Sequence, residues 1–133
     1  MRLFVYGTLL DPDLRTEVVG RAVEGAPAVL RGWRRHAARG RSYPMILPAA
    51  DAAVSGLVLD LDPAAAARIH GYEGGEYVRR AVTAERLADG RPVSCFVYAV
   101  RPGRLVAAGA WDFAAWQAAR SPAHIVASSP PST

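Results

Sequence analysis

Two of the chain's acidic residues, Glu73 and Glu76, are distinguished by their surroundings. They lie in the segment HGYEGGEY, residues 70–77, where glycines and aromatic residues flank the carboxyl groups. Glycine lets the backbone approach a ligand closely, and aromatic neighbours exclude water, which raises the pKa of a carboxyl group. Such a group can act as a general base near neutral pH. The segment also fits a glycine-rich turn whose glutamates face solvent, and its residues alone leave both interpretations open.

A second segment of chemical interest is VYGTL, residues 5–9, which directly follows an apolar run that resembles a strand. We expect this loop to contribute backbone N–H groups rather than a nucleophile, because such groups can hold a carboxylate or a developing oxyanion. Gly7 would allow the close approach, and Leu9 would anchor the loop in the core. Tyr6 fits an ordinary strand aromatic equally well.

Other chemistries find little support in the residue pattern. The glycines match neither the dinucleotide-binding nor the Walker spacing. A serine-histidine-acid triad is not supported either, because the sequence lacks a nucleophile elbow. The three histidines, His36, His70 and His124, show no metal-ligand spacing, so we predict no metal site. Cys95 is the only cysteine, which rules out an internal disulfide; its apolar surroundings favour a buried core thiol over a nucleophile.

Composition predicts one globular domain. The chain has 133 residues, of which 51% are hydrophobic and 21% charged. It contains no apolar run long enough to span a membrane and no secretory signal pattern, so we expect a cytoplasmic protein. The net charge is +4, and the densest basic stretch is RGWRRHAARGR, residues 31–41. This stretch could form a nucleic-acid-binding surface, but a solvated strand and loop is the favoured interpretation.

The elements that must position these residues follow from periodicity and from the helix and turn signals. The predicted strands cover residues 3–6, 26–38, 43–48, 54–61, 76–87 and 93–101. The predicted helices cover residues 13–19, 64–70, ending at Gly71, and 111–119. Asp11-Pro12 and Asp62-Pro63 each provide an N-cap followed by proline at the first helical position. Gly32 is expected to form a bulge.

These elements predict a small single α+β domain, residues 1–120, with a mixed, mostly antiparallel, barrel-like sheet and short flanking helices. Residues 121–133 lose periodicity and gain serine and proline, so we expect a flexible C-terminal tail.

The segments VYGTL (5–9) and YEGGEYVR (72–79), taken together, resemble the gamma-glutamylcyclotransferase family, which includes gamma-glutamylamine cyclotransferase-like and avirulence-induced-gene-like proteins. Tyr43-Pro44, Gly56 and the strand from Cys95 to Val100 also fall where the family has similar residues. The resemblance spans about residues 1–116 and implies a small mixed α+β barrel. It also implies an enzyme that needs no cofactor and converts a γ-glutamyl group into 5-oxoproline, with release of an amine or amino acid.

The same resemblance assigns roles to individual residues. Tyr6, Gly7, Thr8 and Leu9 would form the substrate loop. Glu73, rather than Glu76, would be the catalytic acid/base. The side chains of Tyr43, Tyr77 and Tyr98 are candidates for the cavity wall, although each also fits a packed strand residue.

His70 and Arg79 lie on either side of the Glu73 motif. His70 stands where many family members have aspartate, and this exchange is tolerable if the aspartate only caps or orients the segment. If the aspartate tunes the glutamate, activity or pH dependence would differ here. Arg79 is expected to make a structural pair rather than to bind substrate.

The expected partner is a small γ-glutamyl compound: a dipeptide, glutathione, a γ-glutamyl amine or an ε-linked lysine adduct. Binding to membranes or nucleic acid is not expected, and both a monomer and a homodimer fit the sequence. The alternative to an enzyme is a non-catalytic module that binds a small metabolite on the same fold.

Overall fold

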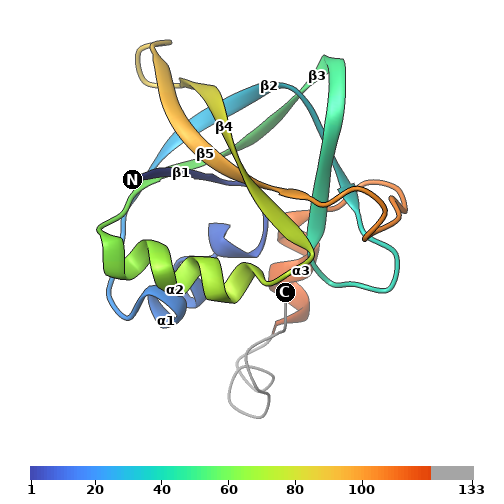
Figure 1. Ribbon diagram of the computed structural model, residues 1–133, viewed down its shortest axis with the longest axis horizontal. Coiled ribbons are helices and arrows are strands. Elements are labelled where there is room, and N and C mark those ends of the chain that lie inside the picture. Colours follow the sequence, from blue (N-terminus) through green and yellow to red (C-terminus); the bar gives the residue numbers. More distant parts are fainter. Residues whose placement is uncertain (121–133) are drawn as a thin grey trace.

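The computed structural model describes residues 1–120, and five strands among them form a closed barrel (Figure 1). The strands are β1 (Arg2–Val5), β2 (Gly25–Ala37), β3 (Pro44–Asp60), β4 (Tyr77–Arg86) and β5 (Pro92–Val100). Their order around the barrel is β1-β3-β2-β4-β5, and every pair is antiparallel except β1 and β5, which run parallel and close the ring. The predicted fold class is confirmed. The predicted tail, residues 121–133, lies outside the described residues.

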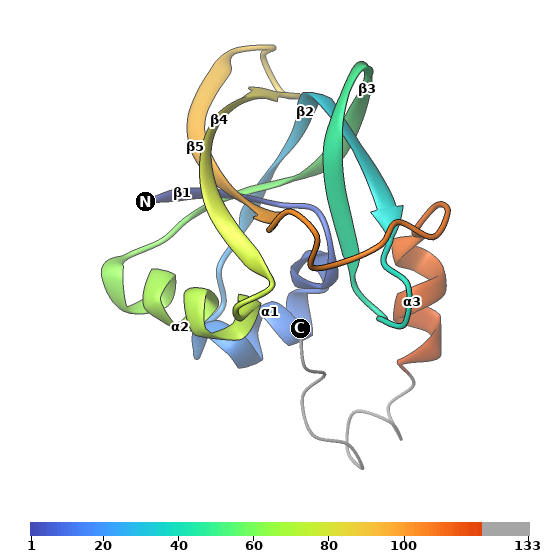
Figure 2. The same cartoon turned by 45° about the vertical axis from the view of Figure 1, so that its right-hand side comes forward.

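Short helices pack on the outside of the barrel. They are η1 (Thr8–Leu10), α1 (Pro12–Val19), α2 (Pro63–Glu73) and α3 (Phe113–Ala119). In Figures 1 and 2, α1 and α2 lie side by side below the barrel, while α3 lies apart from them. The two Asp-Pro starts are confirmed: Leu14 donates its backbone N–H to Asp11 over 3.0 Å, and Ala65 donates to Asp62 over 2.8 Å.

The core has two parts because both faces of the barrel wall are covered. One cluster takes residues from all five strands, among them Phe4, Leu30 and Val97, and fills the barrel. The other cluster joins residues such as Leu3 of β1 and Ile69 of α2, so it lies between the barrel and the helices. Successive residues of β1 therefore enter different clusters, as the alternation of side chains along a strand requires.

Strand β3 runs without a break from Pro44 to Asp60, whereas the sequence predicted two strands, residues 43–48 and 54–61. The segment between them, AADAA at residues 49–53, has no strand-like alternation of apolar and polar residues. Pro48 is tolerated because this part of β3 pairs only with β2, so its other edge has no ladder to complete. The expected bulge at Gly32 is confirmed by a register shift between Arg31 and Trp33 and a φ of 87° at Gly32.

Helix α2 continues through Gly71 and ends at Glu73, so the predicted end at Gly71 is wrong. Gly74, with a φ of 77°, is the residue that ends the helix. A glycine inside a helix costs only about 1 kcal/mol, which tertiary contacts of the last turn can offset. The change matters, because it places Glu73 on a helix rather than in a loop. Helix α3 begins at Phe113, two residues later than predicted, because Asp112 caps it.

Candidate active site

A single pocket brings together the two segments that the sequence singled out. Its cavity volume is about 30 Å³. The pocket is therefore narrow, with room for a slender group. Its lining includes every predicted site residue: Tyr6, Gly7, Thr8, Leu9, Tyr43, Glu73, Tyr77 and Tyr98.

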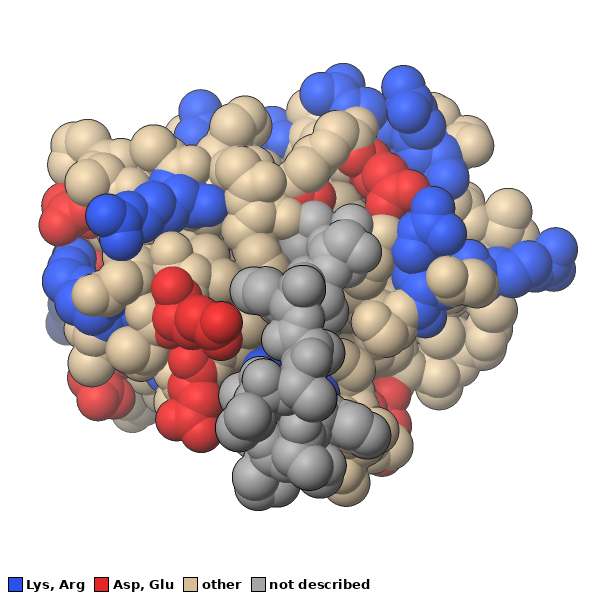
Figure 3. Space-filling view, turned by 90° about the horizontal axis from the view of Figure 1, so that it is seen from below, with Lys and Arg blue, Asp and Glu red and all other residues tan. Residues whose placement is uncertain are grey.

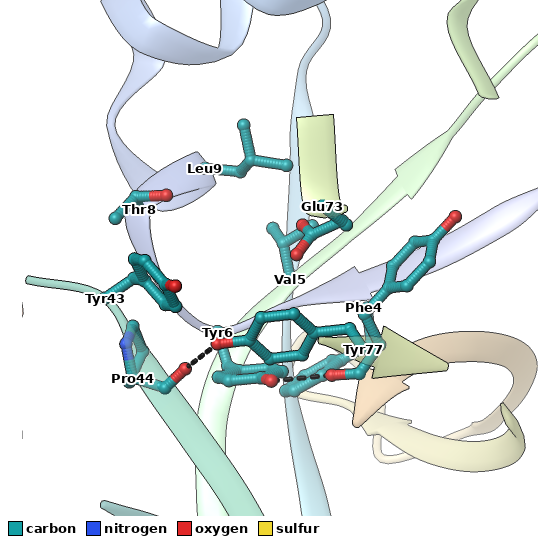
Figure 4. A pocket seen from close by; sticks show the side chains of 11 residues that line it. Phe4, Val5, Tyr6, Thr8, Leu9, Tyr43, Pro44, Glu73 and Tyr77 are labelled. Carbon is teal, nitrogen blue, oxygen red and sulfur yellow. Dashed lines mark hydrogen bonds between the residues drawn. The ribbon is translucent and has the colours of Figure 1, made fainter. Parts of the chain in front are cut away.

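Three further residues line this pocket and were not predicted as site residues: Phe4, Val5 and Pro44. Phe4 and Val5 directly precede the loop, and Pro44 follows Tyr43 in the sequence. Adjacency to the motif residues was the only signal that could have indicated them. Their side chains are apolar, so they make the pocket water-poor (Figure 4).

Glu73 enters the pocket from the C-terminal end of α2. Figure 4 shows its carboxyl group directed into the pocket, beside Val5. The residue is half-buried, and the walls of the pocket desolvate its carboxyl group. This burial raises the pKa of Glu73 to about 8. A carboxyl group with this pKa can both accept and release a proton near neutral pH.

The loop on the opposite side of the pocket has backbone N–H groups available for a ligand. The carbonyl oxygens of Gly7 and Thr8 accept hydrogen bonds from Leu10 and Asp11, at 3.0 and 3.1 Å, which shapes the loop into η1. By contrast, the N–H groups of Gly7, Thr8 and Leu9 donate to no acceptor within residues 1–120. The predicted contribution of the loop is thus structurally possible.

The pocket's tyrosines present their rings while their hydroxyl groups bind other parts of the protein. Tyr6 donates to the Tyr98 carbonyl over 2.6 Å, and Tyr77 donates to the Pro44 carbonyl over 2.6 Å. Figure 4 marks bonds of this kind with dashed lines. The Tyr43 hydroxyl donates to Glu76. These bonds fix the walls, so the rings give the pocket its shape and a dry interior.

Glu76 does not line the pocket and has a structural partner. Its carboxylate lies 2.8 Å from the Arg41 guanidinium, and it also accepts the bond from Tyr43. The hydrogen bond from Arg41 lowers the pKa of Glu76, so this carboxylate is ionised at neutral pH. The two glutamates therefore have opposite environments, and Glu73 is the one suited to proton transfer.

His70 and Arg79 lie behind the pocket wall. His70 is exposed on α2, and its Nδ1 lies 2.8 Å from the Tyr98 hydroxyl. Arg79 places its guanidinium carbon 5.1 Å from the centre of the Phe96 ring, a cation–π contact on the exposed surface of the barrel. This geometry agrees with a structural role for Arg79.

Cys95 is buried inside the barrel, as predicted, and burial raises the pKa of its thiol, which makes it a poor nucleophile. Among residues 1–120, no group of three or more His, Cys, Asp or Glu side chains is arranged to hold a metal ion. Within the same residues, no helix is long and apolar enough to cross a membrane.

The basic stretch 31–41 is largely engaged with acidic residues. Three of its arginines form ion pairs: Arg31 with Glu85, Arg34 with Asp51, and Arg41 with Glu76. In addition, Arg35 donates to the Tyr6 carbonyl over 2.8 Å and so supports the loop of residues 6–9. On the face shown in Figure 3, basic and acidic side chains are interspersed. These contacts agree with the solvated interpretation rather than with a nucleic-acid surface.

Comparison with known proteins decides the family. A family model described as "Gamma-glutamyl cyclotransferase, AIG2-like" matches residues 3–113. The chain belongs to this family. Among curated relatives, it is 30% identical to "Protein AIG2 C" of Arabidopsis thaliana over 117 residues, which cover 86% of this chain and 71% of that protein. It is 32% identical to "AIG2-like protein C" of the same plant over 122 residues, covering 86% and 68%.

Solved structures agree with the fold of this family. The solution structure of an Arabidopsis thaliana protein superposes with a TM-score of 0.73 and 27% identity, covering 94% of this chain and 77% of that one. A structure named "Gamma-glutamyl cyclotransferase" superposes with a TM-score of 0.71 over 80% of this chain and 69% of that one. At 15% identity the latter shows a shared fold only.

Proposed function

We propose that the protein is a gamma-glutamyl cyclotransferase that converts a γ-glutamyl compound into 5-oxoproline and a free amine or amino acid. The observation that carries this proposal is the pocket itself. It combines a water-poor carboxyl group, Glu73, with unused backbone N–H groups of the family's substrate loop, residues 6–9. The family membership supplies the substrate class.

In the proposed reaction, ionised Glu73 first accepts a proton from the substrate's α-ammonium group. The freed amine nitrogen then attacks the γ-carbonyl carbon of the same molecule and forms the new ring C–N bond. The carbonyl oxygen becomes an oxyanion, which the N–H groups of Gly7, Thr8 or Leu9 stabilise. As the carbonyl re-forms, the bond to the leaving nitrogen breaks, and protonated Glu73 returns the proton to that nitrogen. The new ring nitrogen still carries two hydrogens, so the again ionised Glu73 accepts the second one and passes it to the released amine, which leaves as an ammonium ion beside neutral lactam.

This assignment uses the same carboxyl group for every proton transfer and needs no further reactant. Ring closure brings the nucleophile to the carbonyl at high effective concentration, so the protein mainly has to orient the chain and move two protons in turn from the attacking nitrogen to the leaving nitrogen. The narrow, ring-lined pocket is suited to hold the γ-glutamyl part in a folded conformation. We propose that Tyr6, Tyr43, Tyr77 and Tyr98 supply this shape.

The test is the release of 5-oxoproline from a γ-glutamyl dipeptide, glutathione, a γ-glutamyl amine and an ε-linked lysine adduct. Wild-type protein should turn over at least one of them, and Glu73→Gln should abolish turnover while keeping the fold. Glu85→Gln, at an exposed ion pair of β4, is the matched control and should remain fully active. An active Glu73→Gln protein would refute the assignment. Wild-type protein that binds these compounds without turnover would instead support the non-catalytic binding module.

A further inference from the structure

Within the described part of the chain, Glu73 has no hydrogen-bonding partner of its own that fixes its direction. Among residues 1–120, no donor bonds to its carboxyl group, and burial is the sole cause of its raised pKa. A general base must nevertheless be held in place to within a fraction of an ångström. Its orientation must therefore be set by the last turn of α2, which carries it.

That turn is intrinsically loose. Gly71 lies within it and Gly74 ends it, and glycine restricts the backbone less than any other residue. A Cβ atom added at Gly71 would meet nothing within 4 Å, so no other part of the described chain packs against the turn at that point. On its inner side, Ile69 is buried and Tyr72 packs against the core, and hydrogen bonds from neighbouring side chains add a directional restraint.

Two such bonds flank Glu73. The Tyr72 hydroxyl lies 2.9 Å from Thr8 Oγ1 and links the turn to the substrate loop. The His70 Nδ1 lies 2.8 Å from the Tyr98 hydroxyl and links the turn to β5. His70 and Glu73 are three residues apart, so their side chains project from the same side of the helix.

The partner of His70 is itself firmly held. The Tyr98 ring is buried and lines the pocket, and its carbonyl accepts the Tyr6 hydroxyl over 2.6 Å. The rings of His70 and Tyr98 are also in contact, with centroids 5.8 Å apart. A continuous set of contacts thus runs from the helix that carries Glu73, through β5, to the start of the substrate loop.

We propose that His70 is a positioning residue for the reaction: its hydrogen bond to Tyr98 holds the last turn of α2 against the pocket wall and thereby directs Glu73 at the substrate. This inference rests on the proposed function. It gives the histidine at this position a specific task, since the imidazole reaches a pocket-lining hydroxyl. The residue touches no substrate, so it acts only through Glu73.

The test compares His70→Ala with His70→Asn, because the asparagine side chain places a polar atom near the position of Nδ1. His70→Ala should lower kcat about three- to tenfold with little change in KM, as expected for the loss of one hydrogen bond. His70→Asn should restore most of kcat. Tyr98→Phe should lower kcat similarly, and the double variant should be no worse than either single one. An unchanged kcat in His70→Ala, or a failure of asparagine to restore it, would overturn the proposal.

Arg21→Ala is the matched control for general weakening of the helix. It removes an exposed ion pair to Asp62 at the opposite end of α2, so kcat should stay at the wild-type value. An equal loss of kcat in this variant would mean that any destabilisation of α2 is sufficient, and the specific role of His70 would be refuted.

A second readout does not depend on turnover. If the last turn is released, water reaches Glu73, and the pKa of its carboxyl group, followed by carbon NMR, should fall from about 8 toward its ordinary range in His70→Ala and return in His70→Asn. An unchanged pKa in His70→Ala would overturn the positioning role. Absence of turnover in the wild type, together with this pKa change, would refute the proposed function alone.

Discussion

The Glu73→Gln substitution removes the proposed base, and we expect that it also makes the folded protein more stable. The ordinary pKa of a glutamate is near 4.5, and burial raises that of Glu73 to about 8. The unfolded chain therefore loses this proton at lower pH than the folded protein does. Between these two values the folded state binds more protons than the unfolded state, so its stability falls as the pH rises. Below about pH 4.5 the carboxyl group is neutral in both states and carries no such penalty.

The size of the effect follows from the same two values. Each tenfold change in proton affinity corresponds to about 1.4 kcal/mol, so a pKa near 8 instead of 4.5 gives an upper limit of about 4–5 kcal/mol above pH 8. Structural relaxation and entry of water reduce this penalty, because the residue is only half-buried. We expect glutamine, which is neutral at all these pH values, to raise the free energy of unfolding by about 1–3 kcal/mol at pH 8.

Urea denaturation of both proteins at pH 5 and pH 8 measures this difference. The gain should be small at pH 5 and large at pH 8, where it corresponds to a melting temperature several degrees higher. A glutamine variant that is equally stable at pH 8, or less stable, would show that the Glu73 carboxyl group is well solvated or compensated. The account of the raised pKa would then be wrong.

Three other predictions concern the pocket and its support. In wild-type protein, kcat/KM should rise about tenfold per pH unit up to a pKa near 8 and then level off, because only ionised Glu73 accepts the proton; a flat pH profile would contradict this. Gly7→Ala places a Cβ atom 2.9 Å from Pro44 Cγ, so it should narrow the pocket and lower kcat/KM at least tenfold. The same clash should lower the free energy of unfolding, measured by urea denaturation, by about 1–3 kcal/mol. Gly56→Ala places a Cβ atom 2.2 Å from the Val5 carbonyl oxygen and should destabilise the barrel by about 3 kcal/mol or more; a small change in melting temperature would refute the packing there.

The sequence was most informative where a local chemical rule determines the structure. Each Asp-Pro pair predicts a helix start, because the carboxylate accepts a free N–H of the first turn and proline already has the helical φ. Both starts, at Asp11 and Asp62, are present. The buried strands followed from alternation and β-branched residues, and the family resemblance brought distant segments into one expected site.

Local rules were insufficient where contacts between distant segments decide the structure. The end of α2 was predicted at Gly71 because glycine often stops a helix, yet bonds from His70 to Tyr98 and from Tyr72 to Thr8 carry the helix to Glu73. No window of neighbouring residues contains both members of either pair. The partners of the pocket tyrosines' hydroxyl groups were likewise not predictable, since two of the four are backbone carbonyls and the other two are side chains distant in the sequence.

The parallel contact between β1 and β5 is short, with Leu3 opposite Phe96 and Phe4 opposite Val97. The Tyr6–Tyr98 hydrogen bond spans the same junction just beyond the end of β1. Of the pocket-lining residues, Tyr98 is the one that lies on β5, so a nascent chain has neither a closed barrel nor this part of the pocket wall until β5 has been synthesised. A truncation that removes β5 is therefore expected to open this side of the pocket even if the rest of the sheet forms.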